Sequence, residues 1–159
     1  MKRAQPWIGL VARLVVGGTI FAAGYLKVGH LAKSQMAVRA YDVLPISVAN
    51  LLGTILPFAE VAIGILLILG AAVRVNAALS AGLMVLFILA ITQAGLRGLS
   101  IDCGCFGGGG AVEPGKTKYL AEIARDTGLA ALALYLVRYP SSKFSLDKDN
   151  QIQESHDGQ

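Results

Sequence analysis

The stretch VANLLGTILPFAEVAIGILLIL, residues 48–69, decides the fold. It is almost wholly apolar, and Glu60 is its one charged side chain. A helix needs about 20 apolar residues to cross the hydrocarbon layer of a bilayer. The segment is therefore predicted to be a transmembrane helix.

Three other segments fit the same criterion, so spans are predicted at about 7–26, 48–69, 76–94 and 119–139. The first apolar run is expected to be retained as a helix, because Arg13 lies inside it and no clear cleavage site follows. The predicted fold class is all-α: residues 1–140 form an integral membrane four-helix bundle. The polar segment 141–159 is predicted to be a disordered tail.

The composition supports a membrane protein. The chain of 159 residues is 55% hydrophobic and 15% charged, whereas soluble domains carry about 25% charged residues. Its mean hydropathy is +0.61 and its pI about 9.2. The basic residues lie in short segments between the apolar runs, which favours contact with anionic lipid headgroups. No basic-aromatic patch indicates nucleic-acid binding.

Four spans place both termini on one face of the membrane and the loops 27–47 and 95–118 on the other. The first of these loops is predicted to be partly helical along the interface. Basic residues normally reveal the orientation, but here they are evenly divided. The face of the termini carries Lys2, Arg3, Arg74, Arg138, Lys143 and Lys148, and the other face carries Lys27, Lys33, Arg39, Arg97, Lys116 and Lys118.

The second loop contains the sequence SIDCGCFG, residues 100–107, in which Gly104 separates Cys103 from Cys105. Two cysteines are too few for a disulfide-rich scaffold. A disulfide between them closes a tight ring, and Gly104 supplies the backbone freedom that such a ring needs. Strained disulfides are readily reduced, and so short a ring adds little stability. The spacing therefore favours a redox-active pair over a structural crosslink.

Two other interpretations of the cysteines stay open. They can be ordinary loop residues, or they can bind metal. Zinc takes about four ligands, and beyond the two thiols only His30 and Asp102 are remote candidates. No metal site is predicted.

Several ionisable residues fall inside the predicted spans, where they are costly and usually face the interior of a bundle. Helical spacing places them on stripes with small residues, which allow close helix approach. The stripes are Arg13, Gly17, Gly24 and Lys27; Gly53, Pro57, Glu60 and Gly64; and Tyr119, Glu122, Arg125 and Asp126. Together they predict one polar core.

This core is expected to lie near the thiols. A cation lowers the pKa of a nearby thiol, so Arg125 or Lys27 is a candidate to stabilise a thiolate. Glu60 or Asp126 is a candidate to relay the proton. The structural alternative is that Arg125 pairs with Glu60 or Asp126 only to neutralise charge. Arg13 is expected to be structural or interfacial, and His30 to lie at the surface.

These motifs resemble those of the DoxX-like superfamily, and specifically its MauE branch of four-helix membrane proteins. The resemblance covers residues from about 13 to 136. It rests on five elements: Arg13-Leu14 with Gly17 and Gly18, Ala23-Gly24 with Lys27, Pro57 with Glu60 and Gly64, Asp102-Cys103-Gly104-Cys105-Phe106-Gly107, and Glu122-Ile123-Ala124-Arg125-Asp126.

The resemblance implies thiol–disulfide chemistry that supports an exported thiol protein, such as a thioredoxin-like partner, with a quinone as possible acceptor. The catalytic residues are then expected to be Cys103, Cys105, Arg125, Glu60 and Asp126. The quinone is expected between helices near Glu60 and Tyr25, and the residues predicted to bind it are Lys27, Tyr25 and Glu122. The architecture is also similar to the DsbB and vitamin K epoxide reductase class. The chain departs from that class, since it has one cysteine pair and Cys-x-Cys spacing.

Exported compartments permit disulfides and the cytosol rarely does. The cysteine loop is therefore expected outside the cytoplasm, and both termini inside, in a multi-pass protein of the plasma membrane. Two other functions stay open. One is a non-catalytic membrane subunit that docks a soluble oxidoreductase, and the other is a small-solute carrier. The absence of a visible internal repeat speaks against the carrier.

Overall fold

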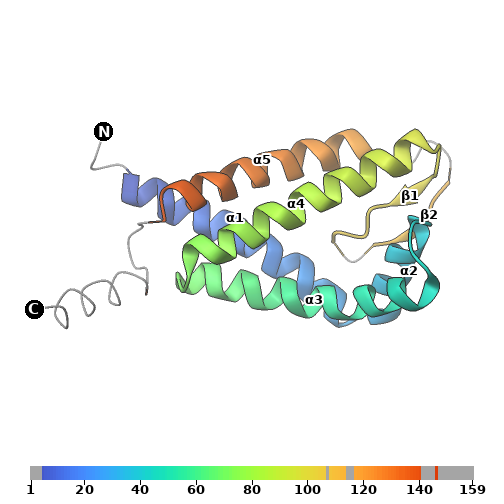
Figure 1. Cartoon of the computed structure of the whole chain (residues 1–159), viewed down its shortest axis with the longest axis horizontal. Helices are drawn as coiled ribbons and strands as arrows, with labels where there is room; N and C mark the ends of the chain where they lie inside the picture. The colour runs from blue at the N-terminus through green and yellow to red at the C-terminus, as the bar shows by residue number, and fades with distance from the viewer. Residues whose placement is uncertain (1–4, 107, 114–116, 141–145, 147–159) are drawn as a thin grey trace, which may run out of the picture.

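The structure is a computed structural model, and it describes residues 5–106, 108–113, 117–140 and 146. These residues form the helices α1 (Gln5–Val28), α2 (Leu31–Ala40), α3 (Ile46–Leu69), α4 (Val73–Leu96) and α5 (Tyr119–Arg138). The strands β1 (Ile101–Asp102) and β2 (Gly110–Ala111) make a small antiparallel ladder. The predicted all-α membrane fold is confirmed (Figure 1). Apart from Leu146, the predicted tail 141–159 lies outside the described residues.

The helix count differs from the prediction. The described residues hold five helices rather than four, because the loop at 27–47 contains α2. Within the described residues, three helices are long and apolar enough to cross a membrane, and they correspond to α1, α3 and α4. The fourth predicted span is the 20-residue helix α5. It is not among these three, and Glu122, Arg125 and Asp126 lie in its first half.

The connection between α3 and α4 is shorter than predicted. Gly70 ends α3 in the left-handed conformation, with φ of 75°, which glycine adopts without steric cost. Ala72 is also left-handed, with φ of 44°, and α4 begins at Val73 instead of near residue 76. The two helices are therefore joined as a tight hairpin.

The four long helices pack mainly as two pairs, α1 on α3 and α4 on α5. Glycines bring the first pair close together. A Cβ added to Gly24 would lie 2.7 Å from the Pro57 carbonyl oxygen, and one added to Gly64 would lie 2.7 Å from the Phe21 backbone nitrogen. The predicted stripes on α1 and α3 are thus buried between helices, which confirms that part of the sequence interpretation.

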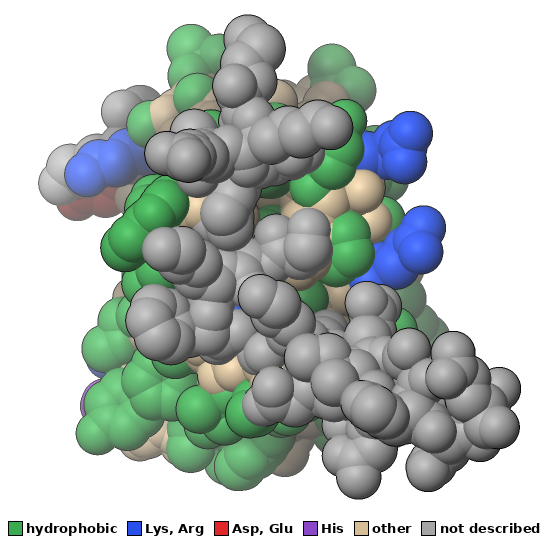
Figure 2. Space-filling view, turned by 90° about the vertical axis from the view of Figure 1, so that its left-hand side faces the viewer, with side chains coloured by type: hydrophobic (Ala, Val, Ile, Leu, Met, Phe, Trp, Pro, Cys, Tyr) green, Lys and Arg blue, Asp and Glu red, His purple; other side chains and the backbone are tan. Residues whose placement is uncertain are grey.

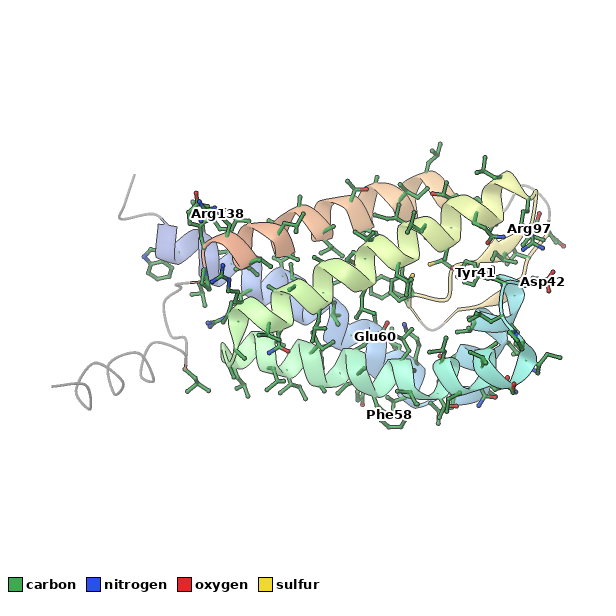
Figure 3. All side chains as sticks on the ribbon, in the orientation of Figure 1. Tyr41, Asp42, Phe58, Glu60, Arg97 and Arg138 are labelled. Carbon is green, nitrogen blue, oxygen red and sulfur yellow. The ribbon has the colours of Figure 1, made fainter. Side chains whose placement is uncertain are left out.

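The outer surface is apolar. Many large hydrophobic side chains are exposed, among them Leu51, Ile55 and Phe58 on one side of α3. Phe58 points away from the bundle, whereas Glu60 points into it (Figure 3). Hydrophobic side chains also surround the end of the molecule seen in Figure 2. Such a surface suits lipid, which confirms the membrane character that the composition indicates.

The two ends of the bundle differ. α1 begins and α5 ends at one end, while α2 and the ladder of β1 and β2 lie at the other (Figure 1). Cys103 and Cys105 follow β1, so the structure places them at the end opposite to the start of α1.

Candidate functional site

The cysteines lie in the turn of the β1–β2 hairpin. Ile101 pairs with Ala111 and Asp102 with Gly110, and Val112 N donates to the Ser100 carbonyl at 2.8 Å. The turn folds inward, because only 7% of Cys103 and 5% of Cys105 is exposed. The candidate site is therefore a buried thiol pair in a surface hairpin.

Two tyrosines hold the hairpin in place. The Tyr119 hydroxyl, at the start of α5, donates to the Leu99 carbonyl at 2.6 Å and accepts from Ile101 N at 3.1 Å. The Tyr41 hydroxyl, just after α2, donates to the Cys103 carbonyl at 3.1 Å. Sequence reasoning placed Tyr119 on the polar stripe of the last helix but missed Tyr41. A single tyrosine in a connecting segment gives no signal of a distant partner.

Gly104 adopts a left-handed backbone, with φ of 71°. Glycine adopts this conformation without steric cost, whereas other residues rarely do. Both cysteines are free thiols. The backbone nitrogen of Gly104 donates to Asp102 Oδ1 at 2.9 Å, and that of Cys105 donates to Cys103 Sγ at 3.3 Å. The turn thus directs an N–H group at the sulfur of Cys103.

The two thiols are chemically unequal. A hydrogen bond from the Cys105 side chain, assisted by the Cys105 backbone N–H, lowers the pKa of Cys103 although burial opposes it. The same hydrogen bond, together with burial, raises the pKa of Cys105. Because the thiolate is the nucleophile, this difference favours Cys103 as the first thiol to ionise.

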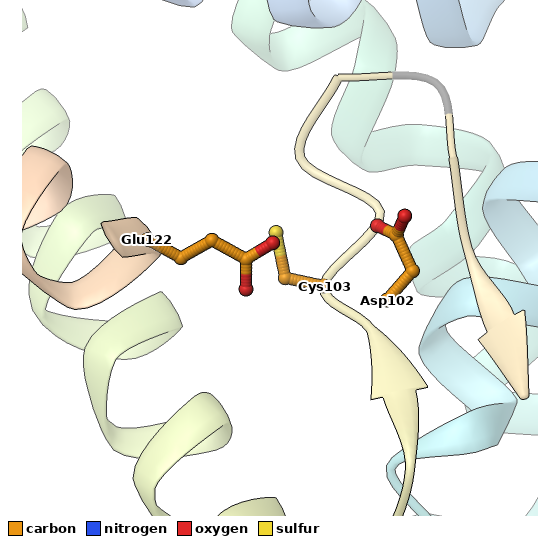
Figure 4. A group of neighbouring side chains, drawn as sticks. All are labelled: Asp102, Cys103 and Glu122. Atoms are coloured by element: carbon orange, nitrogen blue, oxygen red, sulfur yellow. The ribbon is translucent and has the colours of Figure 1, made fainter. Parts of the chain in front are cut away.

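Glu122 lies beside Cys103. Its carboxylate, projecting from α5, points toward the sulfur (Figure 4), and the two groups interact electrostatically. A carboxylate disfavours a neighbouring thiolate, so Glu122 partly offsets the lowering of the Cys103 pKa. Sequence reasoning expected Glu122 at a quinone, and the structure instead places it against the first thiol.

Replacing Glu122 by Gln is expected to make Cys103 react at lower pH. The change removes a negative charge that raises the Cys103 pKa, so the thiolate forms more readily. The midpoint of the pH profile for Cys103 alkylation should fall by about one pH unit, the scale of a single charge contact. Alkylation rates measured between pH 5 and 10 test this. The exposed Glu113→Gln variant is the control, and a shift of equal size there contradicts the assignment.

Asp102, Cys103 and Glu122 could together hold a metal ion, because their ligand atoms lie within 4.8 Å of one another. This trio differs from the set considered from sequence, since His30 is exposed at the start of α2. Asp102 Oδ1 already accepts the Gly104 N–H group, and structural zinc sites take four ligands. The trio therefore adds no argument for a metal centre.

The charged residues inside the bundle form two ion pairs below the thiols. Arg125 donates to Asp126 Oδ1 from Nε at 2.9 Å and approaches it from Nη2 at 2.8 Å. Its guanidinium also lies over the Phe106 ring, 4.8 Å from the centroid. Of the two partners predicted for Arg125, the structure selects Asp126.

Glu60 pairs instead with Lys27. The Lys27 Nζ atom lies 2.7 Å from each carboxylate oxygen of Glu60, and both side chains are buried. The ammonium also lies 5.6 Å from the centroid of the Phe87 ring. Lys27 is thus a partner of Glu60 within the bundle, rather than a residue free to contact a ligand.

A small cavity lies in this region and brings several predicted residues together. Cys105, Glu60, Arg125 and Asp126 line it, and its other walls are mainly apolar: Thr19, Ile20, Ala23, Leu83, Met84, Phe87, Phe106 and Leu129. Asp126 Oδ2 is buried there without a hydrogen-bond partner among the described residues. Cys105 therefore faces a small, partly charged cavity, whereas Cys103 faces Glu122.

Tyr25 does not join the site. It is 66% exposed on α1, where it stacks on Phe21 with ring centroids 5.9 Å apart. The cause is helical geometry: Gly24 faces α3, and the next residue is rotated by about 100° around the helix axis. Of the residues predicted to bind quinone, Lys27 lies near the cavity through Glu60, Glu122 contacts Cys103, and Tyr25 faces outward.

The fold and the site define a small α-helical membrane protein with a buried thiol pair above a charged interior. The family described as methylamine utilisation protein MauE matches residues 5–139. The chain belongs to this family of membrane proteins, which confirms the resemblance seen in its motifs.

One relative is the methylamine utilization protein MauE of Paracoccus denitrificans, which is 30% identical over 106 residues. The match covers 66% of this chain and 57% of the relative, so it spans little more than half of that protein's length. No solved structure matches the chain.

Proposed function

We propose that the chain is a membrane thiol–disulfide redox protein that exchanges electrons through Cys103 and Cys105. The observation that carries the proposal is the asymmetric thiol pair: the Cys105 N–H group points at Cys103 Sγ, and Cys105 lines the interior cavity. One thiol is set up to ionise, and the other faces the place where an acceptor in the bundle would lie. Ordinary loop cysteines need neither feature.

The exchange with a partner protein follows from this asymmetry. The Cys103 thiolate attacks a partner disulfide, forms a mixed disulfide and releases one partner thiolate, which takes up a proton. Cys105 then gives up its proton, attacks Cys103 Sγ and releases the second partner thiolate. The partner gains two electrons, and the chain is left with a Cys103–Cys105 disulfide. The reverse sequence oxidises a partner dithiol with the same residues.

A quinone suits the acceptor side of this proposal, because it takes two electrons and two protons from a dithiol. The cavity offers a cation at Arg125, an unpartnered carboxylate oxygen at Asp126 and mostly apolar walls. These groups match the polarity of a quinone, but the cavity of about 20 Å³ is smaller than a quinone ring, so we propose that its walls move apart when the quinone binds. Asp126, buried beside Cys105, is also the carboxylate best placed to accept a thiol proton. Glu60 lies one step further from the loop, held by Lys27.

An exported thiol protein, such as a thioredoxin-like protein, is the proposed partner. We place the thiol hairpin on the extracytoplasmic side of the plasma membrane and the termini in the cytoplasm, because disulfides persist in exported compartments. The name of the Paracoccus relative assigns that protein to methylamine utilization. We propose the same process, methylamine utilization, as the setting in which this chain acts.

Replacing Cys103 and Cys105 by Ser is expected to abolish electron transfer. The full chain is placed in sealed vesicles with ubiquinone, and reduced thioredoxin is added as the probe partner. Oxidation should fall at least a hundredfold in each single variant, because each sulfur makes a bond that the other cannot replace. Thioredoxin should be oxidised only on the side of the hairpin.

Ser80→Ala serves as the matched control, since it removes a hydrogen bond at the other end of α4. It should retain full activity. A double Ser variant that oxidises thioredoxin as fast as the parent rules the proposal out. That result, with activity lost when the hairpin is deleted, identifies a docking subunit instead.

A further inference from the structure

Two sets of neighbours enclose the hairpin: the cysteine side chains pack near Ile91 on α4 and Tyr119 and Ile123 on α5, and α2 covers the backbone of the turn. Ala37, itself 5% exposed, packs directly against the hairpin. A Cβ added to Gly104 or to Gly109 would collide with the Ala37 side chain. The hairpin therefore lies flush on α2, at a distance that only glycine at these two positions allows.

The end of α2 is tied both to the hairpin and to α4. The Tyr41 hydroxyl donates to the Cys103 carbonyl at 3.1 Å. Arg97, at the end of α4, donates from Nη1 to the Tyr41 carbonyl at 3.2 Å and to the Asp42 carbonyl at 3.1 Å. Its Nη2 atom donates to Asp42 Oδ2 at 3.1 Å. The three labelled side chains gather at this end of the molecule in Figure 3.

The first half of α2 is fixed differently. A Cβ added to Gly53 on α3 would lie 2.6 Å from the Gln35 Cα atom, and Gln35 Nε2 donates to Thr54 Oγ1 at 2.9 Å. α2 is thus packed closely on α3 and is not free to swing away. The hairpin, in which residues 108–110 are all glycine, is the part that can separate from the cover.

We propose that α2 acts as a fixed cover over the turn, that Tyr41 and Arg97 are positioning residues which hold the thiol hairpin closed beneath it, and that the cysteines react only when the hairpin moves out from between α2 and the helices α4 and α5. A protein partner gains access to Cys103 by replacing the contacts of the hairpin with Ala37 and Tyr41. The inference concerns regulation of the thiol pair and rests on the proposed function for its biological meaning. Its test reads thiol reactivity directly, so it can fail while the proposed function stands.

The test is the alkylation rate of Cys103 and Cys105 in the reduced, detergent-solubilised full chain, followed by mass spectrometry with a maleimide. Tyr41→Phe removes one hydroxyl and keeps the ring. Loss of one net hydrogen bond should raise the open population, and hence both rates, about fivefold. Arg97→Gln, which frees Tyr41 and Asp42 from α4, should act in the same direction. Ser80→Ala, a buried hydrogen-bond deletion at the far end of α4, should leave the rates unchanged.

The pH dependence separates opening from a change in thiol chemistry. Burial raises the pKa of Tyr41, so its hydroxyl stays a donor throughout the range from pH 6 to 9. Opening multiplies the alkylation rate by the same factor at each pH, whereas an altered thiol pKa moves the profile along the pH axis. Three results would each contradict the proposal. They are unchanged alkylation rates in Tyr41→Phe and Arg97→Gln, a pH profile that moves along the pH axis, and an equal acceleration in Ser80→Ala.

Discussion

Replacing Lys27 by Met is expected to destabilise the bundle by about 3–5 kcal/mol, because it leaves the Glu60 carboxylate buried without its cation. Glu60 is 2% exposed, and both of its oxygens lie 2.7 Å from Lys27 Nζ. The other cation at this cavity, Arg125, is already paired with Asp126 and does not replace that contact. Thermal and SDS unfolding of the purified protein at pH 8 measure the loss.

The double variant Lys27→Met, Glu60→Gln should recover most of this stability. It removes both charges together, so neither remains buried alone. The surface pair Arg97–Asp42, whose side chains are 42% and 80% exposed, provides the comparison. Breaking that pair should cost at most about 1 kcal/mol of stability. If the double variant were as unstable as Lys27→Met, the ion pair would not be what stabilises this part of the bundle.

The sequence predicts the membrane fold well because the physical requirement is simple. A helix that crosses a bilayer must be long and apolar, and residues 48–69 show this without any reference to the rest of the chain. α2 is harder to define. Its ten residues carry Lys33, Ser34, Gln35 and Arg39 among apolar ones, a pattern that fits an interfacial helix equally well. Its role as a cover depends on Ala37 meeting two glycines far along the chain.

The choice of ionic partners lies beyond sequence reasoning for a similar reason. The stripes on α1 and α3 indicate correctly which faces are buried, because helical periodicity fixes the angle of each residue, whereas on the α5 stripe only Asp126 is fully buried. They do not give the axial position at which one helix packs against the next, that is, the depth at which facing residues meet. Glu60 therefore pairs with Lys27 instead of Arg125, and Tyr25 faces outward although it is adjacent to Gly24. Only the packed structure supplies both rotation and depth.

The different surroundings of Cys103 and Cys105 also follow from helix packing. The sequence indicates a reactive pair but treats Cys103 and Cys105 as equivalent. The hairpin turn aims the Cys105 N–H group at Cys103 Sγ, and the position of α5 sets Glu122 against one thiol and the Arg125–Asp126 pair near the other. The expected difference in thiol reactivity thus depends on how the hairpin turn is placed against α5.

Replacing Gly24 by Ala is expected to cost about 2–3 kcal/mol of stability, since overpacking forces neighbouring groups apart. The new Cβ would lie 2.7 Å from the Pro57 carbonyl oxygen and 2.8 Å from Glu60 Cβ, so α1 must move away from α3. Gly18 is the matched control on the same helix, because a Cβ there meets nothing within 4 Å. Gly18→Ala should gain about 0.5–1 kcal/mol from helix propensity.

The comparison of the two variants isolates close packing from propensity, because each exchanges the same residue types in one helix. Unfolding in SDS gives both free energies under one condition. Separation of α1 from α3 would also lengthen the Lys27–Glu60 contact, so Gly24→Ala should reduce the additional loss that Lys27→Met causes. Fully additive losses for Gly24→Ala and Lys27→Met would show that the ion pair forms independently of the glycine contact. In that case the depth at which α1 meets α3 is set elsewhere, and Gly17 and Gly64, which bring the same helices together further along, become the residues that determine it.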